Sequence, residues 1–205
     1  MQAQLSLLGH EPPLFASDFP GIARHELRGA AWIEVHPEWL AGHWQLFETL
    51  REQTCWQRDR RTMYERMVEV PRLTARLPEH GPLPAIVARM SEALSLRYGQ
   101  RLDRISAAWY RDGRDSVAPH GDRVGRGRSD CVVAIVSLGE PRRFLLKPVA
   151  GGPSRLFRLG HGDLIVMGGQ CQRTWLHSVP KVARAGPRIS VQFRPAPVSR
   201  AEADR

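Results

Sequence analysis

The tripeptide His-Gly-Asp occurs twice in the chain, as His120–Asp122 in "VAPHGDRVG" and as His161–Asp163 in "LGHGDLIVMGG". Side chains alternate between the two faces of an extended strand, so the imidazole and the carboxylate of His-x-Asp lie on the same face. Either copy could therefore offer two metal ligands side by side. The surroundings of each copy indicate which of them is suited to that chemistry.

The first copy lies in "DGRDSVAPHGDRVGRGRSD", residues 112–130, which is a long polar stretch rich in glycine. Binding and catalytic side chains concentrate in such loops. The second copy runs directly into the apolar "LIVM" and is typical of a tight turn that begins a buried strand. The sequence therefore predicts a site at the first copy, and a turn with a surface histidine at the second.

A third ligand is available at His177 in "RTWLHSVP", 55 residues after Asp122. Two neutral imidazoles and one carboxylate on one side of a metal leave the opposite side open, as in the non-haem Fe(II) oxygenases. At this point a zinc or manganese site in a hydrolase or a cupin-like protein is the alternative.

The strand-like segment "RISVQFR" alternates strictly between polar and apolar residues. Its polar members are Arg188, Ser190, Gln192 and Arg194, and its apolar members are Ile189, Val191 and Phe193. A guanidinium group matches a carboxylate in a planar, two-pronged way, so two inward-leaning arginines on one face could clamp a small dicarboxylate such as 2-oxoglutarate. The alternative is the solvated polar face of an edge strand.

The elements that must position these residues form two groups along the chain. Two amphipathic helices are predicted, at 37–53 and 84–99, on the spacing of their apolar residues. From Arg104 onward, six short β-branched or aromatic runs alternate with Gly and Pro, which favours an antiparallel barrel or jelly roll. We expect an α+β, mainly β fold, with an N-terminal extension at 1–15 and a single domain at 16–205.

Charge and composition restrict the possible partners. The net charge is +9, and residues 1–50 hold 2 Arg against 6 acids, so the other 155 residues hold 28 bases against 15 acids, or +13. This balance suits a polyanion such as nucleic acid, although 28 of the 30 bases are Arg, a bias that genome composition alone could produce. No segment predicts a membrane span or a signal peptide, and three scattered cysteines fit reduced thiols, so we expect a cytoplasmic protein.

The ordered motifs from about Trp109 to Pro195 resemble the AlkB-type Fe(II)/2-oxoglutarate dioxygenases, which oxidatively dealkylate nucleobases. These motifs are "WYRDGRDSVAPHGDRV", "AIVSLGEPRRFLLK", "LGHGDLIVMGG", "WLHSVPK" and "PRISVQFRP". The resemblance implies a double-stranded β-helix (jelly-roll) core at about 105–193 with the N-terminal helices packed against it. It also implies Fe(II) as cofactor, with 2-oxoglutarate and O2 as co-substrates.

The resemblance also implies a role for each matching residue. Fe(II) would be held by the catalytic triad His120, Asp122 and His177. The 2-oxoglutarate would contact Tyr110 and Arg188 at its distal carboxylate, Arg194 near its chelating end, and Ser190 between them. The segment "MYERMVEVPR" resembles the part that recognises the nucleotide, and the implied substrate residues are Tyr64, at the position of an aromatic wedge, Arg72 and Val124. An ordinary helix-face or core aromatic is the alternative for Tyr64.

Three residues depart from the family pattern. Many members carry Asn at the positions of Ala108 and Ser190, so the 2-oxoglutarate clamp is expected to be looser or to use water. Val124 stands where well-studied members carry an acid that reads the exocyclic amine of adenine or cytosine. We expect activity on N1-methyladenine or N3-methylcytosine to persist with reduced discrimination, because one hydrogen bond is a modest share of base recognition.

The expected function is repair of N-alkylated bases in nucleic acid, with DNA as the first choice and RNA as the alternative. A hydroxylase acting on protein or a small molecule would explain the motif order and Val124, but not the charge. A metal-free or zinc-bearing nucleic-acid-binding module would explain the charge alone. We further expect a monomer without membrane contact, and "QLSLL" at Gln4–Leu8 resembles the motif by which bacterial repair proteins dock on the replication sliding clamp.

Overall fold

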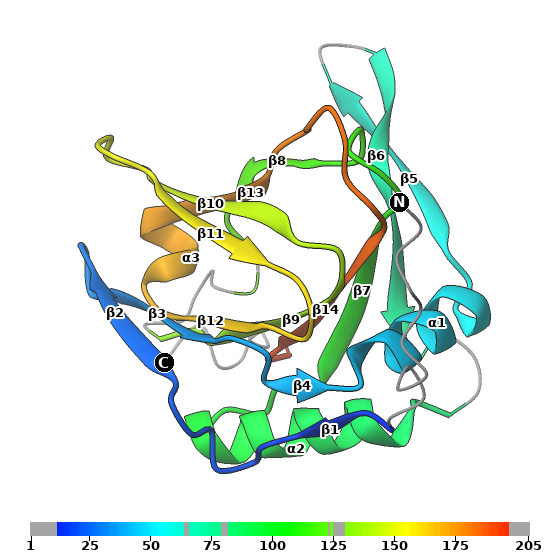
Figure 1. Cartoon of the computed structure of the whole chain (residues 1–205). Helices are drawn as coiled ribbons and strands as arrows, with labels where there is room; N and C mark the ends of the chain where they lie inside the picture. Colours follow the sequence, from blue (N-terminus) through cyan, green and yellow to red (C-terminus); the bar gives the residue numbers. More distant parts are fainter. Residues whose placement is uncertain (1–11, 64–65, 79–81, 123, 125–129, 197–205) are drawn as a thin grey trace.

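A computed structural model describes residues 12–63, 66–78, 82–122, 124 and 130–196. In this part of the chain, an antiparallel sheet of eight strands faces an antiparallel sheet of four strands (Figure 1). Two facing sheets with inward-pointing side chains form a jelly-roll core, as the strand pattern predicts.

The larger sheet has the order β2 (Ala23–Leu27), β3 (Ala31–His36), β12 (Leu164–Gly169), β9 (Val133–Gly139), β14 (Arg188–Arg194), β7 (Arg104–Tyr110), β6 (Arg66–Leu77), β5 (Gln57–Met63). The smaller sheet has the order β11 (Arg155–Leu159), β10 (Arg142–Pro148), β13 (Trp175–Val179), β8 (Val117–His120). A third, two-stranded sheet pairs β1 (Leu14–Phe15) with β4 (Leu40–Ala41). The helices are α1 (His43–Gln53), α2 (Ala85–Tyr98) and the short α3 (Cys171–Thr174).

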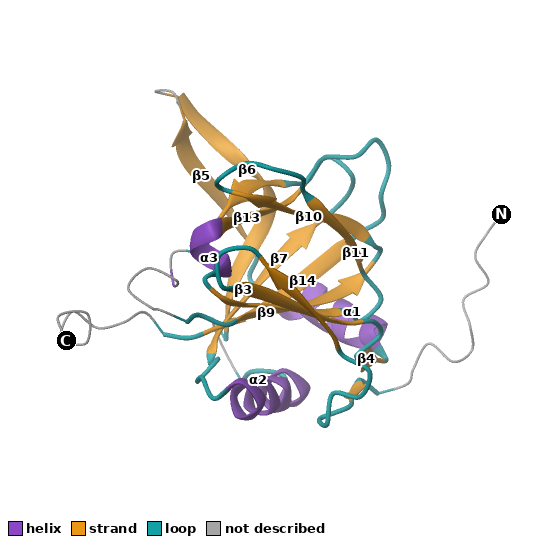
Figure 2. Cartoon of the chain, turned by 90° about the vertical axis from the view of Figure 1, so that its left-hand side faces the viewer, coloured by secondary structure: helices purple, strands orange, loops and turns teal. Residues whose placement is uncertain are grey.

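The outer face of the larger sheet packs on α1 and α2, and α2 lies below the sheet in Figures 1 and 2. The apolar residues of β14, Ile189, Val191 and Phe193, share one buried cluster with Phe47 of α1 and Leu94 of α2. Burial of a side chain of this size stabilises the fold by about 1.5–3 kcal/mol. The packing of α1 and α2 fixes the position of β14, and therefore of Arg188 and Arg194 on the opposite face of that strand.

The inner face of β14 is buried as well. Between the two sheets lies a second apolar cluster that includes Tyr110, Val133, Phe144 and Ile165. Strand β14 is not an edge strand, because it pairs with β9 on one side and with β7 on the other. Its polar face is therefore directed into the interior of the jelly roll, and the alternative of a solvated edge is wrong.

The predicted start of the first helix is also wrong, by six residues. Leu40 is buried and continues the helical spacing of apolar residues, but Leu40 and Ala41 pair with β1 as a strand. Helix α1 begins only at His43, after Gly42 with φ 62°. Phe15, within the predicted N-terminal extension, packs at 4.7 Å from the ring of Trp39.

Two parts of the larger sheet lie outside the six predicted runs. The pair β2–β3 extends one edge of the sheet, and the hairpin β5–β6 extends the other and projects beyond the body of the molecule (Figure 1). In each pair one strand, β2 or β5, is rich in charged residues and lacks the apolar character of a typical strand. In the described part of the chain, no helix has the length and apolar character needed to cross a membrane.

Candidate active site

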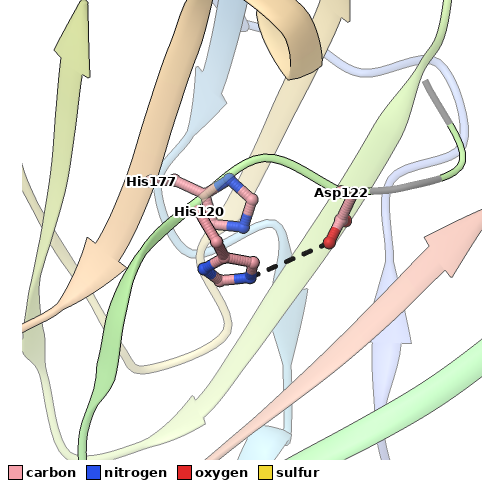
Figure 3. Close-up of side chains that lie close together, drawn as sticks. All are labelled: His120, Asp122 and His177. Atoms are coloured by element: carbon pink, nitrogen blue, oxygen red, sulfur yellow. Dashed lines mark ion pairs between the residues drawn. The ribbon is translucent and has the colours of Figure 1, made fainter. Parts of the chain in front are cut away.

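The two histidines of the predicted triad lie on neighbouring strands of the smaller sheet. His120 ends β8 and is paired in register with His177 of β13. Their ring centroids are 4.2 Å apart, and Asp122 follows just beyond the end of β8 (Figure 3). One potential ligand atom from each of the three residues lies within 4.8 Å of the others. The structure thus brings together the first His-Gly-Asp copy and His177, as predicted.

Both imidazoles are held in the neutral form. The Nδ1 of His120 lies 2.9 Å from the carbonyl oxygen of Ala118, so an Nδ1–H there donates to it and leaves the Nε2 lone pair for a metal. Burial lowers the pKa of His120, and it lowers the pKa of His177, which stacks on Phe144, to about 3. Neutral imidazoles are the form that binds metals.

The carboxylate of Asp122 is held in the ionised form. Burial alone raises the pKa of Asp122, but the charge of Arg194 and its hydrogen bond outweigh that effect and hold the pKa at about 2. The Nε–H of Arg194 donates to Oδ2 at 2.7 Å, and Oδ1 lies 3.9 Å from Nε2 of His120. The backbone N–H of Asp122 donates to the side-chain oxygen of Gln172 at 2.9 Å.

These donors suit a divalent metal ion. Two neutral nitrogens and one anionic oxygen converge from one side, which is the donor set of the facial triad in Fe(II) oxygenases. The carboxylate is oriented by Arg194, and one imidazole by Ala118, so the ligands are supported by a second layer of hydrogen bonds. The residues present therefore fit Fe(II).

The structure buries Arg188, the first arginine of the predicted dicarboxylate clamp. Arg188 is 1% exposed, and its Nη2 donates to the hydroxyl of Ser137 at 2.7 Å. Its Nε and Nη1 are buried and have no hydrogen-bond partner among the described residues. Burial lowers the pKa of Arg188 to about 10, and its guanidinium carbon lies 5.2 Å from the ring centroid of Tyr110. A buried cation with two unused donors fits one carboxylate of 2-oxoglutarate.

The two departures in the clamp lie opposite each other. Ser190 of β14 is paired in register with Ala108 of β7, so two small side chains adjoin where many family members carry Asn. The amide of Gln192 donates to the hydroxyl of Ser190 at 2.6 Å and accepts from the hydroxyl of Ser106 at 2.9 Å. The side chain of Gln192 therefore supplies an amide next to the two small residues.

Two supporting residues, Gln172 and Ser106, were missed by the sequence analysis, which also assigned no role to Gln192. Gln172 holds the backbone of Asp122, while Ser106 accepts a hydrogen bond from Nη1 of Arg194 at 2.7 Å and donates to Gln192. Only the alternating pattern of β14 placed Gln192 on the polar face. Ser106 and Gln172 carry no sequence signal, because each acts through a residue 50 or more positions away.

The predicted substrate residues are placed in part. Val124 is 7% exposed and lines a cavity together with Asp122 and Arg194. Arg72 of β6 is half-buried, its Nε and Nη1 have no hydrogen-bond partner among the described residues, and its charge helps to lower the pKa of both His120 and His177. Tyr64 lies outside the described residues.

The second His-Gly-Asp copy forms a turn, as predicted. His161 is exposed, with φ 49°, and Gly162 follows with φ 92°. Asp163 accepts hydrogen bonds from the backbone N–H groups of Glu38 at 2.8 Å and Gly160 at 3.0 Å. Its carboxylate therefore ties two segments of backbone together.

Comparison with known proteins identifies the family. The family model of the 2OG-Fe(II) oxygenase superfamily matches residues 43–194. The chain belongs to this superfamily. Its similarity to the DNA oxidative demethylase ALKBH2 of Arabidopsis thaliana, 31% identity over 74% of this chain and 61% of that protein, supports membership of the AlkB family within it.

Two further similarities extend over most of the chain. The uncharacterised protein R406 of Acanthamoeba polyphaga mimivirus is 26% identical over 70% of this chain and 72% of that protein. The solved structure of OsALKBH1 superposes with a TM-score of 0.56 at 14% identity, and covers 85% of this chain and 100% of that one, which shows the shared fold.

The superfamily and the site together establish the class of chemistry. The protein is a 2-oxoglutarate-dependent dioxygenase that uses Fe(II) and O2, as the resemblance implied. The chain spans about three fifths of the length of the Arabidopsis demethylase, so the substrate of that protein is not carried over with the family.

Proposed function

We propose that the protein removes alkyl groups from N-alkylated bases of nucleic acid, most of all DNA, and releases succinate, CO2 and an aldehyde. The observation that carries this proposal is a cavity beside the triad that has arginines on its lining. Arg76 and Arg104 are exposed there, while Asp122 and Arg194 lie deeper. Exposed guanidinium groups around a reactive centre suit the phosphates that flank a target base. The net charge of +9 and the similarity to a DNA demethylase support the same substrate class.

In the proposed mechanism, His120, Asp122 and His177 hold the metal from one side. Fe(II) with 2-oxoglutarate and O2 supplies the oxidation of the N-alkyl carbon, after which the hydroxylated group leaves as an aldehyde. Asp122 stays ionised because Arg194 donates to its outer oxygen, and both imidazoles stay neutral because they are buried. The ligand set is therefore ready at neutral pH without the prior loss of a proton.

The co-substrate would lie along the polar face of β14. Arg188 offers its two unused donors to the distal carboxylate, and the buried Tyr110 flanks the same guanidinium. Arg194 lies at the other end of the strand, beside the metal ligand Asp122, where it can meet the chelating end. Ser190 lies between them and is oriented by the amide of Gln192.

The substrate base would occupy the cavity beside Asp122. Val124 gives this cavity an apolar wall, and Arg72 supplies a buried cation near the imidazoles. An enzyme that acts on a base in a duplex must extrude that base, and an aromatic residue can fill the vacated stack. Tyr64, which lies outside the described residues, is the residue we assign to that role.

The proposal is tested by measuring succinate release with Fe(II), O2 and 2-oxoglutarate in the presence of an alkylated oligonucleotide, the matching unmodified oligonucleotide, or none. We expect release to be stimulated by the alkylated strand only, in a panel of single- and double-stranded DNA and RNA. Strong turnover of 2-oxoglutarate with no response to any nucleic acid would instead indicate a hydroxylase of protein or a small molecule.

The remaining partner assignments are also proposals. The segment Gln4–Leu8 lies outside the described residues, and its docking on a sliding clamp is tested with a peptide of residues 1–12 and the double substitution Gln4→Ala with Leu7→Ala. Binding of the peptide to purified clamp, with loss on double substitution and unchanged activity on free oligonucleotide, is the expected result. Unfolding of the enzyme by the double substitution would refute it. A cytoplasmic monomer is our proposal for location and assembly.

A further inference from the structure

The cavity beside the triad has an unusual charge for a site that would hold an alkylated base. Its volume is about 210 Å³, and the residues that matter to its charge and shape are Arg76, Arg104, Ser106, Asp122, Val124 and Arg194. Neighbouring strands supply its wall, because Arg76 is in register with Ser106, and Arg104 with Arg194. Pockets for drug-sized ligands measure about 300–1,000 Å³, so this one suits a smaller group such as a single base.

The described residues that line this cavity offer no free carboxylate to a positively charged ligand. Among the described residues that line it, Asp122 is the only acid. Its Oδ2 already accepts from Arg194 at 2.7 Å, and its Oδ1 faces His120. Val124 contributes only an apolar surface to the lining.

Positive charge, in contrast, surrounds the cavity. Arg76 and Arg104 are exposed and can be neutralised by the phosphates of a bound strand. Arg72 is less open to such neutralisation, because it is half-buried and its Nε and Nη1 are buried without a hydrogen-bond partner among the described residues. Its charge acts on His120 and His177, the ligands beside which the substrate must react.

Binding of the metal and the co-substrate does not reverse this balance. A divalent metal, the Asp122 carboxylate, a dianionic 2-oxoglutarate and the guanidinium groups of Arg188 and Arg194 together leave about one positive charge at the centre. Arg72 adds another. A cationic base would therefore enter a partly buried site of its own sign, and no described residue of the lining offers a free carboxylate to offset the repulsion.

We propose that this site prefers uncharged alkylated bases to cationic ones, which names the substrate class and rests on the proposed dealkylase function. Two N3-methylated pyrimidines separate the two classes. N3-Methylcytosine is a cation at neutral pH, whereas N3-methylthymine is neutral and carries its methyl group on the same ring atom. The reaction, the departing carbon and the ring size are the same for both. The two bases differ in charge, in the amine or carbonyl at C4, and in the methyl group at C5, and the variants below separate the effect of charge from that of a hydrogen bond to the C4 group.

The test uses the full chain with Fe(II) and 2-oxoglutarate, and two single-stranded oligonucleotides that differ only in this base. Formaldehyde release gives kcat/KM for each, and fluorescence anisotropy without O2 gives the dissociation constants. We expect the neutral lesion to be preferred by about fivefold or more, and Val124→Glu to shift the ratio toward the cation by about tenfold, the size of one charge-assisted contact. Val124→Gln, which has a similar shape without the charge, should shift the ratio far less.

A second variant covers the case in which Val124→Glu does not fold. Arg72→Gln removes the buried cation and should move the ratio in the same direction, by about threefold, given its partial exposure to solvent. Equal use of the two lesions, or a preference of the natural protein for N3-methylcytosine, overturns the proposal. So do equal shifts for Val124→Glu and Val124→Gln. Turnover of 2-oxoglutarate without demethylation of either strand overturns the dealkylase function itself, and with it this inference.

Discussion

The two His-Gly-Asp copies contain the same atoms, yet one lies in the candidate metal site and the other ties a turn. In the first copy, the carboxylate of Asp122 bonds to a side chain, Arg194, and keeps one oxygen directed at His120. In the second copy, both oxygens of Asp163 accept from backbone N–H groups. A carboxylate whose two oxygens are used by the backbone has little left for a metal.

The two central glycines differ in a similar way. Gly162 has φ 92°, a conformation that side chains rarely adopt, and a Cβ there would overlap the carbonyl oxygen of Leu40. Gly121 has no positive φ, but a Cβ there would overlap the carbonyl oxygen of Gln172. Gly121 allows α3 to approach the metal ligands, and Gly162 allows the chain to turn.

What separates the two copies is the neighbouring strand. His120 has His177 in register beside it, and together with Asp122 they complete a triad. His161 lies 5.6 Å from the ring of His43, which packs at an angle to it and is buried enough for its pKa to fall to about 4. The tripeptide is thus a local motif, and the function depends on a residue that the fold supplies from elsewhere.

The largest expected effect is the difference between removing His177, which completes the triad of the first copy, and removing His161, which belongs to the second copy. His177→Ala should weaken Fe(II) or Mn(II) binding by about 100-fold or more and abolish 2-oxoglutarate turnover, because it deletes a ligand. His161→Ala should leave both unchanged, because this side chain is exposed. Isothermal titration with Mn(II) and succinate release measure the two effects.

Two results would break the comparison. Retained turnover in His177→Ala would remove this residue from the site. Loss of metal binding in His161→Ala, with the melting temperature unchanged, would place the metal at the second copy.

The next effect concerns 2-oxoglutarate, which should bind beside the first His-Gly-Asp copy and not beside the second. Arg188→Ala should raise the apparent KM for 2-oxoglutarate by about 10- to 100-fold, because a charge-assisted, two-pronged contact is lost. Arg188→Lys should have a smaller effect, because Lys keeps the charge and loses the fork. Equal effects of the two substitutions would indicate that only the charge matters, and the absence of any effect would show that the clamp is elsewhere.

The second copy should matter to stability instead. Asp163→Ala should lower the free energy of unfolding by about 1–3 kcal/mol, because it leaves two backbone N–H groups without an acceptor. Metal affinity should not change. Asp122→Ala should show the reverse pattern, with loss of metal binding and a smaller loss of stability. Urea denaturation of the metal-free proteins measures this, and a stable Asp163→Ala variant would contradict it.

Strand β14 shows how far the sequence can predict this site. Its alternation of polar and apolar residues predicted both the buried arginine face and the core face, because a strict period of two has one physical cause. The motif order also predicted the triad. The start of α1 was wrong, since the spacing of Leu40 suits a helix as well as the strand that it joins.

The supporting contacts could not be predicted. Ser106 and Gln192 are 86 positions apart and meet only because β7 and β14 are paired. The strands β2 and β5 are rich in charged residues and do not stand out in the sequence, and both are ordered by joining a sheet that already exists. Local patterns predict local elements, whereas contacts between distant elements need the topology.

A pH titration probes the buried histidines of both regions in the metal-free protein. The pKa of His177 is about 3 in the folded state and 6.5 in an unperturbed histidine, so between these values the unfolded chain binds more protons. Stability should therefore fall as pH drops below about 6.5, and one such group contributes about 2 kcal/mol between pH 7 and pH 5. His177→Gln should flatten this slope more than His43→Gln does, and an unchanged slope in both would show that neither imidazole is buried in the neutral form.

The smallest expected effect concerns the side chain that supports Asp122 from a distance. Asp122 accepts from Arg194, Arg194 donates to Ser106, and Ser106 donates to Gln192 at 2.9 Å. Because Gln192 accepts a hydrogen bond from the hydroxyl of Ser106, a lone pair of that hydroxyl oxygen is turned toward Arg194. At Asp163, backbone N–H groups take the place of these side chains. Substitutions at Ser106 or Gln192 should therefore affect the carboxylate of the first copy only.

Gln192→Leu should weaken Mn(II) binding by about two- to tenfold, the lower part of the range for supporting contacts of metal ligands, and leave the melting temperature of the metal-free protein nearly unchanged. Ser106→Ala should have a similar effect. If the residues act as one chain, the double variant should lose no more affinity than either single variant, which a double-mutant cycle measures. Fully additive losses would mean that Gln192 and Ser106 act independently, and that Arg194 alone orients the carboxylate of the first copy.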